Sequence, residues 1–144
     1  MMVLLIGAGM IVATTTVHAL FTAFALYLHR FWCKKRPHFG FSEAVLAISS
    51  LVIVMFVASA AETMIWAAFF VFDGGFDPAE PFETIVYFAV VTYTTLGYGD
   101  IVLDPPHRMF AAICSVNGII MFGWTTAIVI AVVQRIYFGE KSTE

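Results

Sequence analysis

The sequence predicts an all-α membrane protein in which three helices span the bilayer and a shorter apolar segment enters and returns on one side. Three observations support this fold class. Of the 144 residues, 61% are hydrophobic and only 12% are charged. The mean hydropathy is +0.93, far above ordinary soluble usage. The apolar residues also come in long runs rather than in the short stripes of a water-soluble core.

Three apolar runs are long enough to cross the hydrocarbon core, which takes about 20 helical residues. They cover residues 1–28, 44–72 and 109–133. A secretory signal peptide is the alternative for the first run. No Lys or Arg precedes it, however, and it is longer than the apolar part of such a signal. We therefore interpret residues 1–30 as a retained N-terminal transmembrane helix.

Charge placement predicts the orientation of these helices. The loop between the first two spans and the end of the third carry the basic residues Arg30, Lys34, Lys35, Arg36, Arg135 and Lys141. The positive-inside rule places both regions in the cytoplasm, although juxtamembrane basic clusters can also bind lipid headgroups. Residues 73–104 hold six carboxylates and no basic residue, so we expect them outside. In a multi-pass protein of the cell membrane with three spans, the N-terminus then lies outside and the C-terminus in the cytoplasm.

A short apolar stretch between the second and third spans cannot cross the membrane. Residues 85–91 are apolar but too few, and the polar run 92–100 follows them. Asp77 ahead of Pro78, Glu80 and Pro81 is typical of a helix start with Asp77 as N-cap. We predict a short helix over residues 81–94 followed by a re-entrant loop. Non-helical backbone at membrane depth has to be buried in protein or line a water-filled path, so a pore or cavity is implied.

The loop Thr95-Leu96-Gly97-Tyr98-Gly99 has the composition of a cation pathway. Gly97 and Gly99 can adopt positive φ, which allows successive carbonyls to point the same way. Rings of backbone carbonyls can replace the hydration shell of K⁺. One chain provides only one wall of such a column, so several copies have to surround an axis.

The run from Thr94 to Asp100 resembles the selectivity-filter signature of the potassium channel pore-domain family, and its place between two spans is the context that the motif requires. The resemblance covers residues 44–138. It implies an outer helix over 44–72, a pore helix over 81–94, a filter over 95–99 and an inner helix over 107–136. The N-terminal helix 1–30, a basic cytoplasmic loop 31–43 and a short cytoplasmic tail 139–144 lie outside it. Leu96 stands where Val or Ile is commoner, a mild departure because this position contributes a carbonyl.

By this resemblance, the chain forms a homotetramer that conducts K⁺ passively down its electrochemical gradient. K⁺ binds at Thr95, Leu96, Gly97 and Tyr98, Gly99 completes the filter, and no other cofactor is expected. Membrane lipids and a separate regulatory subunit are further expected partners, and nucleic acid is not.

The resemblance also assigns supporting residues. Tyr87 and Asp100 support the filter through a hydrogen bond, whereas Val91 stands where some relatives add an acidic residue. On the inner helix, Gly118 lies near the family's hinge, and close helix packing is the alternative role for this small residue. The side chains around the cavity below the filter are Ile119, Phe122, Thr126 and Ile130.

Five polar or reactive residues have more than one interpretation. Glu62, an ionisable group inside a span, fits either a proton or lipid sensor or a hydrogen bond to a neighbouring helix. His18 and Asn117 fit hydrogen bonding between helices better than ligand binding. Cys33, at a cytoplasmic boundary, can accept a reversible acyl chain. Cys114 lies in the middle of a helix, and we expect no disulfide with Cys33.

Two other functions stay open. A weakly selective cation channel would share this architecture, although Tyr98 argues against it. A non-conducting regulatory membrane subunit would use the first helix to assemble with longer channels. The sequence has no helix with arginine at every third position, no nucleotide-binding loop and no nucleophile constellation. We therefore expect neither a voltage sensor nor an enzyme.

Overall fold

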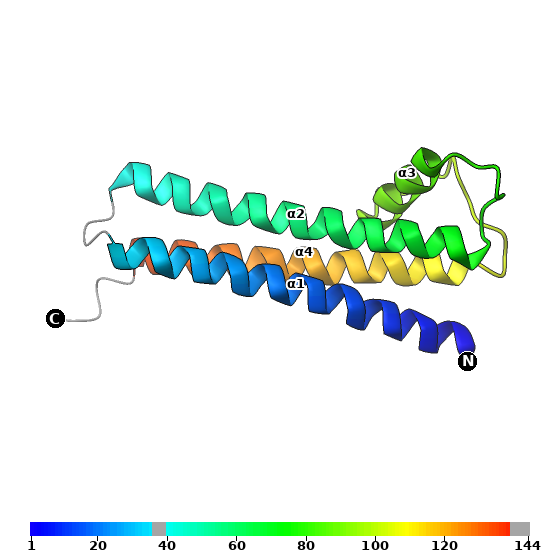
Figure 1. The fold of residues 1–144 in the computed structure, drawn as a ribbon, viewed down its shortest axis with the longest axis horizontal. Coiled ribbons are helices and arrows are strands. Elements are labelled where there is room, and N and C mark those ends of the chain that lie inside the picture. Colours follow the sequence, from blue (N-terminus) through cyan, green and yellow to red (C-terminus); the bar gives the residue numbers. More distant parts are fainter. Residues whose placement is uncertain (36–39, 139–144) are drawn as a thin grey trace.

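In the computed structural model, four α-helices make up the regular structure of the residues that are described. Residues 1–35 and 40–138 are described, with side chains for 1–31 and 40–136, and this part of the chain contains no strand. The helices are α1 (Met2–Lys35), α2 (Phe41–Asp73), α3 (Phe82–Tyr93) and α4 (Arg108–Phe138). The three long helices run side by side, and the short α3 lies against one end of the bundle (Figure 1). The predicted all-α fold class is confirmed.

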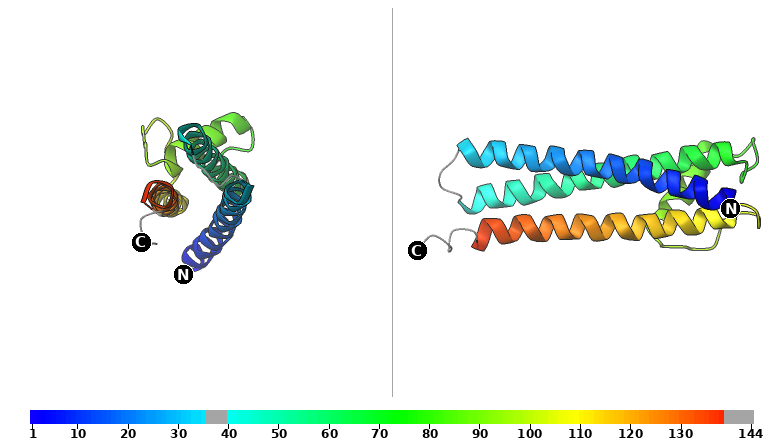
Figure 2. Two further views of the ribbon diagram at one scale, coloured as in Figure 1. Left: turned by 90° about the vertical axis from the view of Figure 1, so that its left-hand side faces the viewer. Right: turned by 90° about the horizontal axis from the view of Figure 1, so that it is seen from below.

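Among the described residues, three stretches are long and apolar enough to cross a membrane: Met2–Phe31, Phe41–Asp73 and Arg108–Ile136. Successive long helices run in opposite directions. The start of α1 and the end of α4 therefore lie at opposite ends of the bundle (Figure 1). The N-terminus lies at the end that carries α3 and the loop after it (Figure 2). Whatever side of the membrane this loop faces, the beginning of α1 is expected on the same side.

The long helices extend beyond the apolar runs that predict them. α1 continues through Lys35, past the expected end at residue 30, and α2 begins at Phe41 rather than at residue 44. α2 ends at Asp73, and its C-cap residue Gly74 has a φ of 80°, the left-handed conformation that glycine adopts readily. Two predicted features lie outside the described residues. One is the basic cluster with the acylation site, of which the side chains of Lys34, Lys35, Arg36 and Cys33 are not described. The other is the tail 139–144.

The predicted N-cap role of Asp77 is wrong. α3 starts at Phe82, and Pro81 occupies its N-cap position without a side-chain hydrogen bond. Asp77 closes a separate turn, in which its Oδ1 accepts from the Ala79 N–H at 2.8 Å and its carbonyl accepts from Glu80 N–H at 2.9 Å. The residue before a proline is biased away from helical conformation, so Pro81 separates this turn from the helix.

Aromatic packing holds α3 against α2 and α2 against α4. The core cluster includes Phe70 of α2 and Phe88 of α3, whose ring centroids lie 5.2 Å apart. Phe110 of α4 belongs to the same cluster, and its ring lies 4.9 Å from that of Phe69. Both pairs have the edge-to-face geometry that aromatic rings prefer. The start of the loop after α3 is thereby positioned by the core.

Candidate ion-conduction site

The loop after α3 has an alternating backbone conformation. Thr95, Gly97 and Gly99 have φ values of 60°, 55° and 78°, whereas φ is not positive at the intervening Leu96 and Tyr98. A backbone in which residues of positive φ alternate with residues of negative φ turns successive N–H groups to one side and leaves the carbonyls on the other. Sequence reasoning expects positive φ at the two glycines but misses it at Thr95. A non-glycine residue held in such a region costs about 1 to 3 kcal/mol, so the surroundings have to hold it.

Hydrogen bonds to the last turn of α3 hold the start of this loop. The Val91 carbonyl accepts from the N–H groups of Leu96 and Gly97 at 2.9 and 3.3 Å. The Val90 carbonyl accepts from the Thr94 N–H at 2.9 Å and from the Thr94 hydroxyl at 2.7 Å. The loop therefore leaves directly from the carboxyl end of α3, where the helix dipole places partial negative charge.

The far end of the loop is tied back to the middle of α3. The Tyr87 hydroxyl donates to Asp100 Oδ2 at 2.7 Å, and Asp100 Oδ1 accepts from the Ile101 N–H at 3.1 Å. The hydrogen bond to the Asp100 carboxylate raises the pKa of Tyr87, so the hydroxyl keeps its proton and remains a donor. The side chain of Val91 is buried and adds no polar group to this contact. The loop is thus attached to α3 at both ends.

One face of the loop is uncovered in the single chain. Leu96 is 55% exposed and Tyr98 is 67% exposed, and residues 94–100 are all classed as exposed. Large side chains in such a position are typical of a surface that neighbouring copies or a membrane cover. In the single chain, residues 94–100 therefore stay open to contact with neighbouring molecules.

The predicted residues of the inner helix fall on two faces of α4. Ile119, Phe122, Thr126 and Ile130 are all exposed, and their spacing of three and four residues places them along one face. The Thr126 hydroxyl donates to the Phe122 carbonyl at 2.9 Å. Gly118 is instead buried against the carboxyl end of α3.

Gly118 permits a close approach between α4 and α3. A Cβ at this position would lie 1.8 Å from the Tyr93 carbonyl oxygen. This close approach of α4 to the Tyr93 carbonyl gives Gly118 the packing role that small residues have at helix interfaces. Its role as a hinge stays a prediction.

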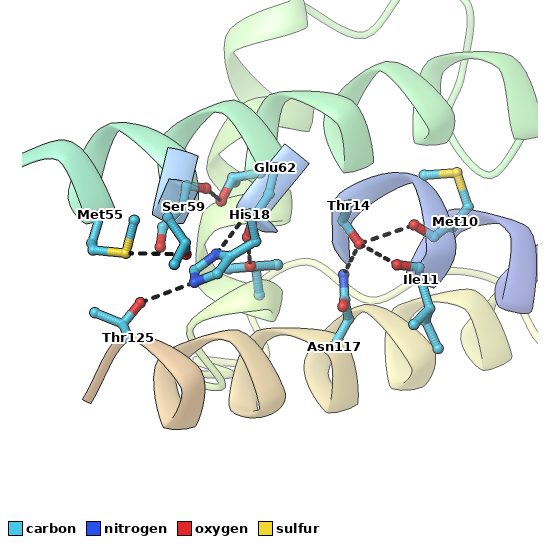
Figure 3. Close-up of polar contacts among 12 residues, drawn as sticks. Met10, Ile11, Thr14, His18, Met55, Ser59, Glu62, Asn117 and Thr125 are labelled. Carbon is cyan, nitrogen blue, oxygen red and sulfur yellow. Dashed lines mark hydrogen bonds and ion pairs between the residues drawn. The ribbon is translucent and has the colours of Figure 1, made fainter. Parts of the chain in front are cut away.

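A buried polar cluster, which the sequence does not reveal as a unit, joins four helices. Glu62 of α2 accepts from the Tyr93 hydroxyl and lies 2.8 Å from His18 of α1. The Asn117 amide of α4 donates to the Thr14 hydroxyl of α1 at 2.8 Å (Figure 3). Glu62, His18 and Asn117 thus form hydrogen bonds between helices, which is one of the interpretations that their sequence positions allow. Residues that sequence reasoning missed altogether are Thr14 and Tyr93.

Two contacts near the loop are also not predicted from the sequence. His107 Nδ1 lies 2.6 Å from Asp73 Oδ2, joining the segment before α4 to the end of α2. The hydroxyl of Ser115 donates to the Thr92 carbonyl at 3.0 Å and adds a further bond between α4 and α3. Both contacts join residues that are far apart in the chain, which no local pattern indicates.

Comparison with known families identifies the class of the protein. Residues 50–135 match the model of a family described as ion channel. The match includes most of α2, all of α3, the loop and nearly all of α4, and it covers more than half of the chain. The protein therefore belongs to the ion channel family. No curated protein and no solved structure gives a significant match.

Proposed function

We propose that the protein is the pore-forming subunit of a potassium-selective channel, in which four copies surround one central pore. The observation that carries the proposal is the alternating backbone of Thr95 to Gly99, uncovered on one face at the end of a short helix. Membership of the ion channel family supports conduction in general. Selectivity for K⁺ and the fourfold assembly rest on the filter sequence.

The proposed mechanism is replacement of the hydration shell of K⁺ by protein oxygens. Backbone carbonyls of Thr95, Leu96, Gly97 and Tyr98, repeated in four copies, bind the ion as it sheds its water. The carboxyl ends of the four α3 helices turn their partial negative charge toward the same axis and favour a cation there. K⁺ then moves passively, down its electrochemical gradient.

The uncovered face of α4 suits the wall of a cavity below the filter. Ile119, Phe122 and Ile130 make this wall mainly apolar, and Thr126 adds a hydroxyl. Wide apolar cavities keep water and ions mobile because they offer few binding groups. Four such faces would connect the filter to the opposite side of the membrane.

The proposed orientation places the filter and N-terminus outside and the C-terminus in the cytoplasm. It is supported by the carboxylates of residues 73–104 at one end of the bundle. Arg30 and Arg135 support it at the other end, where α1 and α4 finish. Membrane lipids cover the remaining apolar helix faces. A separate regulatory subunit is a further proposed partner.

Flux through purified protein in liposomes tests the proposal. We expect K⁺ to pass far faster than Na⁺, and Ba²⁺ to block the flux because it resembles K⁺ in size but binds carbonyls more tightly. Gly99→Ala places a Cβ on a residue with φ of 78° and should abolish selective flux. Gly9→Ala, where nothing lies within 4 Å of the added Cβ, should keep it.

The outcomes of this experiment separate the proposed function from its two alternatives. Equal fluxes of K⁺ and Na⁺ would mean a weakly selective cation channel. No flux from assembled protein would mean a non-conducting regulatory subunit. Native mass measurement of the same sample should give four chains per particle, and a dimer would contradict the proposed pore.

A further inference from the structure

A buried polar chain connects the N-terminal helix to the helix that carries the filter. His18 of α1, Glu62 of α2 and Tyr93 of α3 are each 0% exposed. His18 Nδ1 lies 2.8 Å from Glu62 Oε1, and the Tyr93 hydroxyl donates to Glu62 Oε2. Glu62 therefore joins α1 and α3 to α2 at one point.

The other side of the His18 ring faces α4. His18 Nε2 lies 3.4 Å from the Thr125 hydroxyl, and the imidazole centroid lies 5.4 Å from the Trp124 ring. Figure 3 shows His18 between Glu62 and Thr125. A single side chain of α1 thus contacts the two long helices on which the ion channel match lies. α1 itself precedes the matched residues 50–135.

Tyr93 connects the hydrogen-bonded series His18–Glu62–Tyr93 to the proposed filter. It is the last residue of α3, two positions before Thr95. Its carbonyl packs directly against Gly118, and its ring lies 5.8 Å from that of Phe122. A displacement of Tyr93 therefore moves the start of the filter on one side and presses on α4 on the other.

Because the hydrogen bonds to Glu62 are buried, separating His18 or Tyr93 from Glu62 is costly. A carboxylate inside a membrane helix is costly unless it is paired, and hydrocarbon offers no replacement donors. Removing a donor from a buried acceptor costs more than the hydrogen bond itself contributes, because the acceptor stays desolvated. α1, α2 and the end of α3 are thus expected to move as one unit.

We propose that α1 positions the selectivity filter through His18, Glu62 and Tyr93, which act as positioning residues that hold the filter in its conducting conformation. This inference rests on the proposed potassium conduction. It gives the first helix a part in conduction, beyond its part in anchoring. A shift of α1 within the membrane is transmitted to Thr95 by way of Glu62 and Tyr93.

Single substitutions measure the effect of each bond on the filter. Tyr93→Phe and His18→Leu each remove one hydrogen-bond partner of Glu62. The rate of current decay in planar bilayers should rise about tenfold or more in each, with the tetramer retained. His18→Gln keeps a neutral donor and should recover most of the wild-type rate. Thr22→Val is the matched control, because Thr22 is buried one turn along α1 and its hydroxyl donates to Met55 Sδ at 3.9 Å rather than to Glu62.

A triple substitution separates positioning from simple stability. His18→Leu, Glu62→Met and Tyr93→Phe together replace the polar chain by apolar groups, a change that often preserves or increases the stability of a buried site. We expect a stable tetramer whose current decays about tenfold faster and whose preference for K⁺ over Na⁺ falls. A stable triple variant with wild-type decay and selectivity would overturn the inference.

The wild-type protein provides a test that needs no folded variant. Coupling between two sites is reciprocal, so K⁺ in the filter has to affect His18 if His18 affects the filter. The ¹⁵N resonances of His18, assigned with His18→Gln, should differ between potassium and sodium buffers in lipid. Unchanged His18 resonances, while the filter backbone resonances shift, would contradict the coupling.

The wild-type control separates this inference from the proposed function. Wild-type currents without preference for K⁺ would overturn both proposals. Selective wild-type currents combined with an unaffected triple variant would overturn only the role of α1. Selective currents with faster decay in the triple variant and not in Thr22→Val would support both.

Discussion

Alanine at position 118 tests how closely α4 has to approach the end of α3. The added Cβ would lie 1.8 Å from the oxygen and 2.9 Å from the carbon of the Tyr93 carbonyl. Contacts under 3.0 Å are essentially never made by a real Cβ, so the two helices have to separate by about 1.2 Å. The obstructing atoms belong to backbone and cannot rotate away as a side chain could.

The expected cost follows from two opposing effects. Overpacking of this kind costs about 1 to 3 kcal/mol, whereas alanine in place of glycine favours a helix by about 0.5 to 1 kcal/mol. We expect Gly118→Ala to lower tetramer stability by about 1 to 2 kcal/mol on balance. Because the displaced atom lies two residues before Thr95, faster filter inactivation should accompany the loss of stability.

Thermal dissociation of the purified tetramer and single-channel recording measure these two effects. Gly123→Ala is the matched control on the same helix, since nothing lies within 4 Å of its added Cβ. The control should be at least as stable as the wild type. If Gly118 serves only as a hinge, alanine would stiffen α4 and reduce opening without loss of stability. A Gly118→Ala tetramer as stable as Gly123→Ala would refute the packing argument.

Three further predictions follow from the loop and the topology. Tyr87→Phe and Asp100→Asn should each hasten inactivation with assembly intact, and the double variant should be little worse than either, so additive effects in the cycle would contradict a direct pair. The raised pKa of Tyr87 means that this bond contributes fully below pH 10.0 and is lost only as pH rises through the raised value. Current decay should therefore quicken only at strongly alkaline pH, and a quickening below pH 10.0 that persists in Tyr87→Phe would have another source. Impermeant reagents should reach a tag before Met1 from outside and a tag after Glu144 only from the cytoplasm, and both tags on one side would contradict three spans.

The spans could be predicted because the bilayer imposes a length that apolar runs reveal directly. Their ends could not be read as well, because hydropathy marks the hydrocarbon boundary while the helix continues beyond it, as α1 does through Lys35. At the start of α3, Asp77 provides a local N-cap signal. Pro81 overrides it by separating that turn from the helix.

The loop of residues 95–99 shows the same division between local and long-range information. Positive φ at Gly97 and Gly99 could be predicted because glycine lacks the Cβ that opposes it. Positive φ at Thr95 could not, since β-branched residues avoid that region and only the surrounding loop imposes it.

The hydrogen bonds that join His18, Glu62 and Tyr93 connect residues that are far apart in the sequence. His18 and Glu62 are 44 positions apart, and Tyr93 is a further 31 positions along. A helix that is apolar on all sides carries no signal for the face that it turns inward. The sequence could therefore indicate that Glu62 needs a partner within the membrane, but not that its partners are His18 and Tyr93.

The reversal potential of the purified protein in a planar bilayer, with K⁺ on one side and Na⁺ on the other, tests the potassium pore most directly. If the carbonyls of residues 95–98 form the filter, the reversal potential should lie far from zero, in the direction that favours K⁺ over Na⁺. Ba²⁺ should block the current. A current that reverses near zero under these conditions would contradict it.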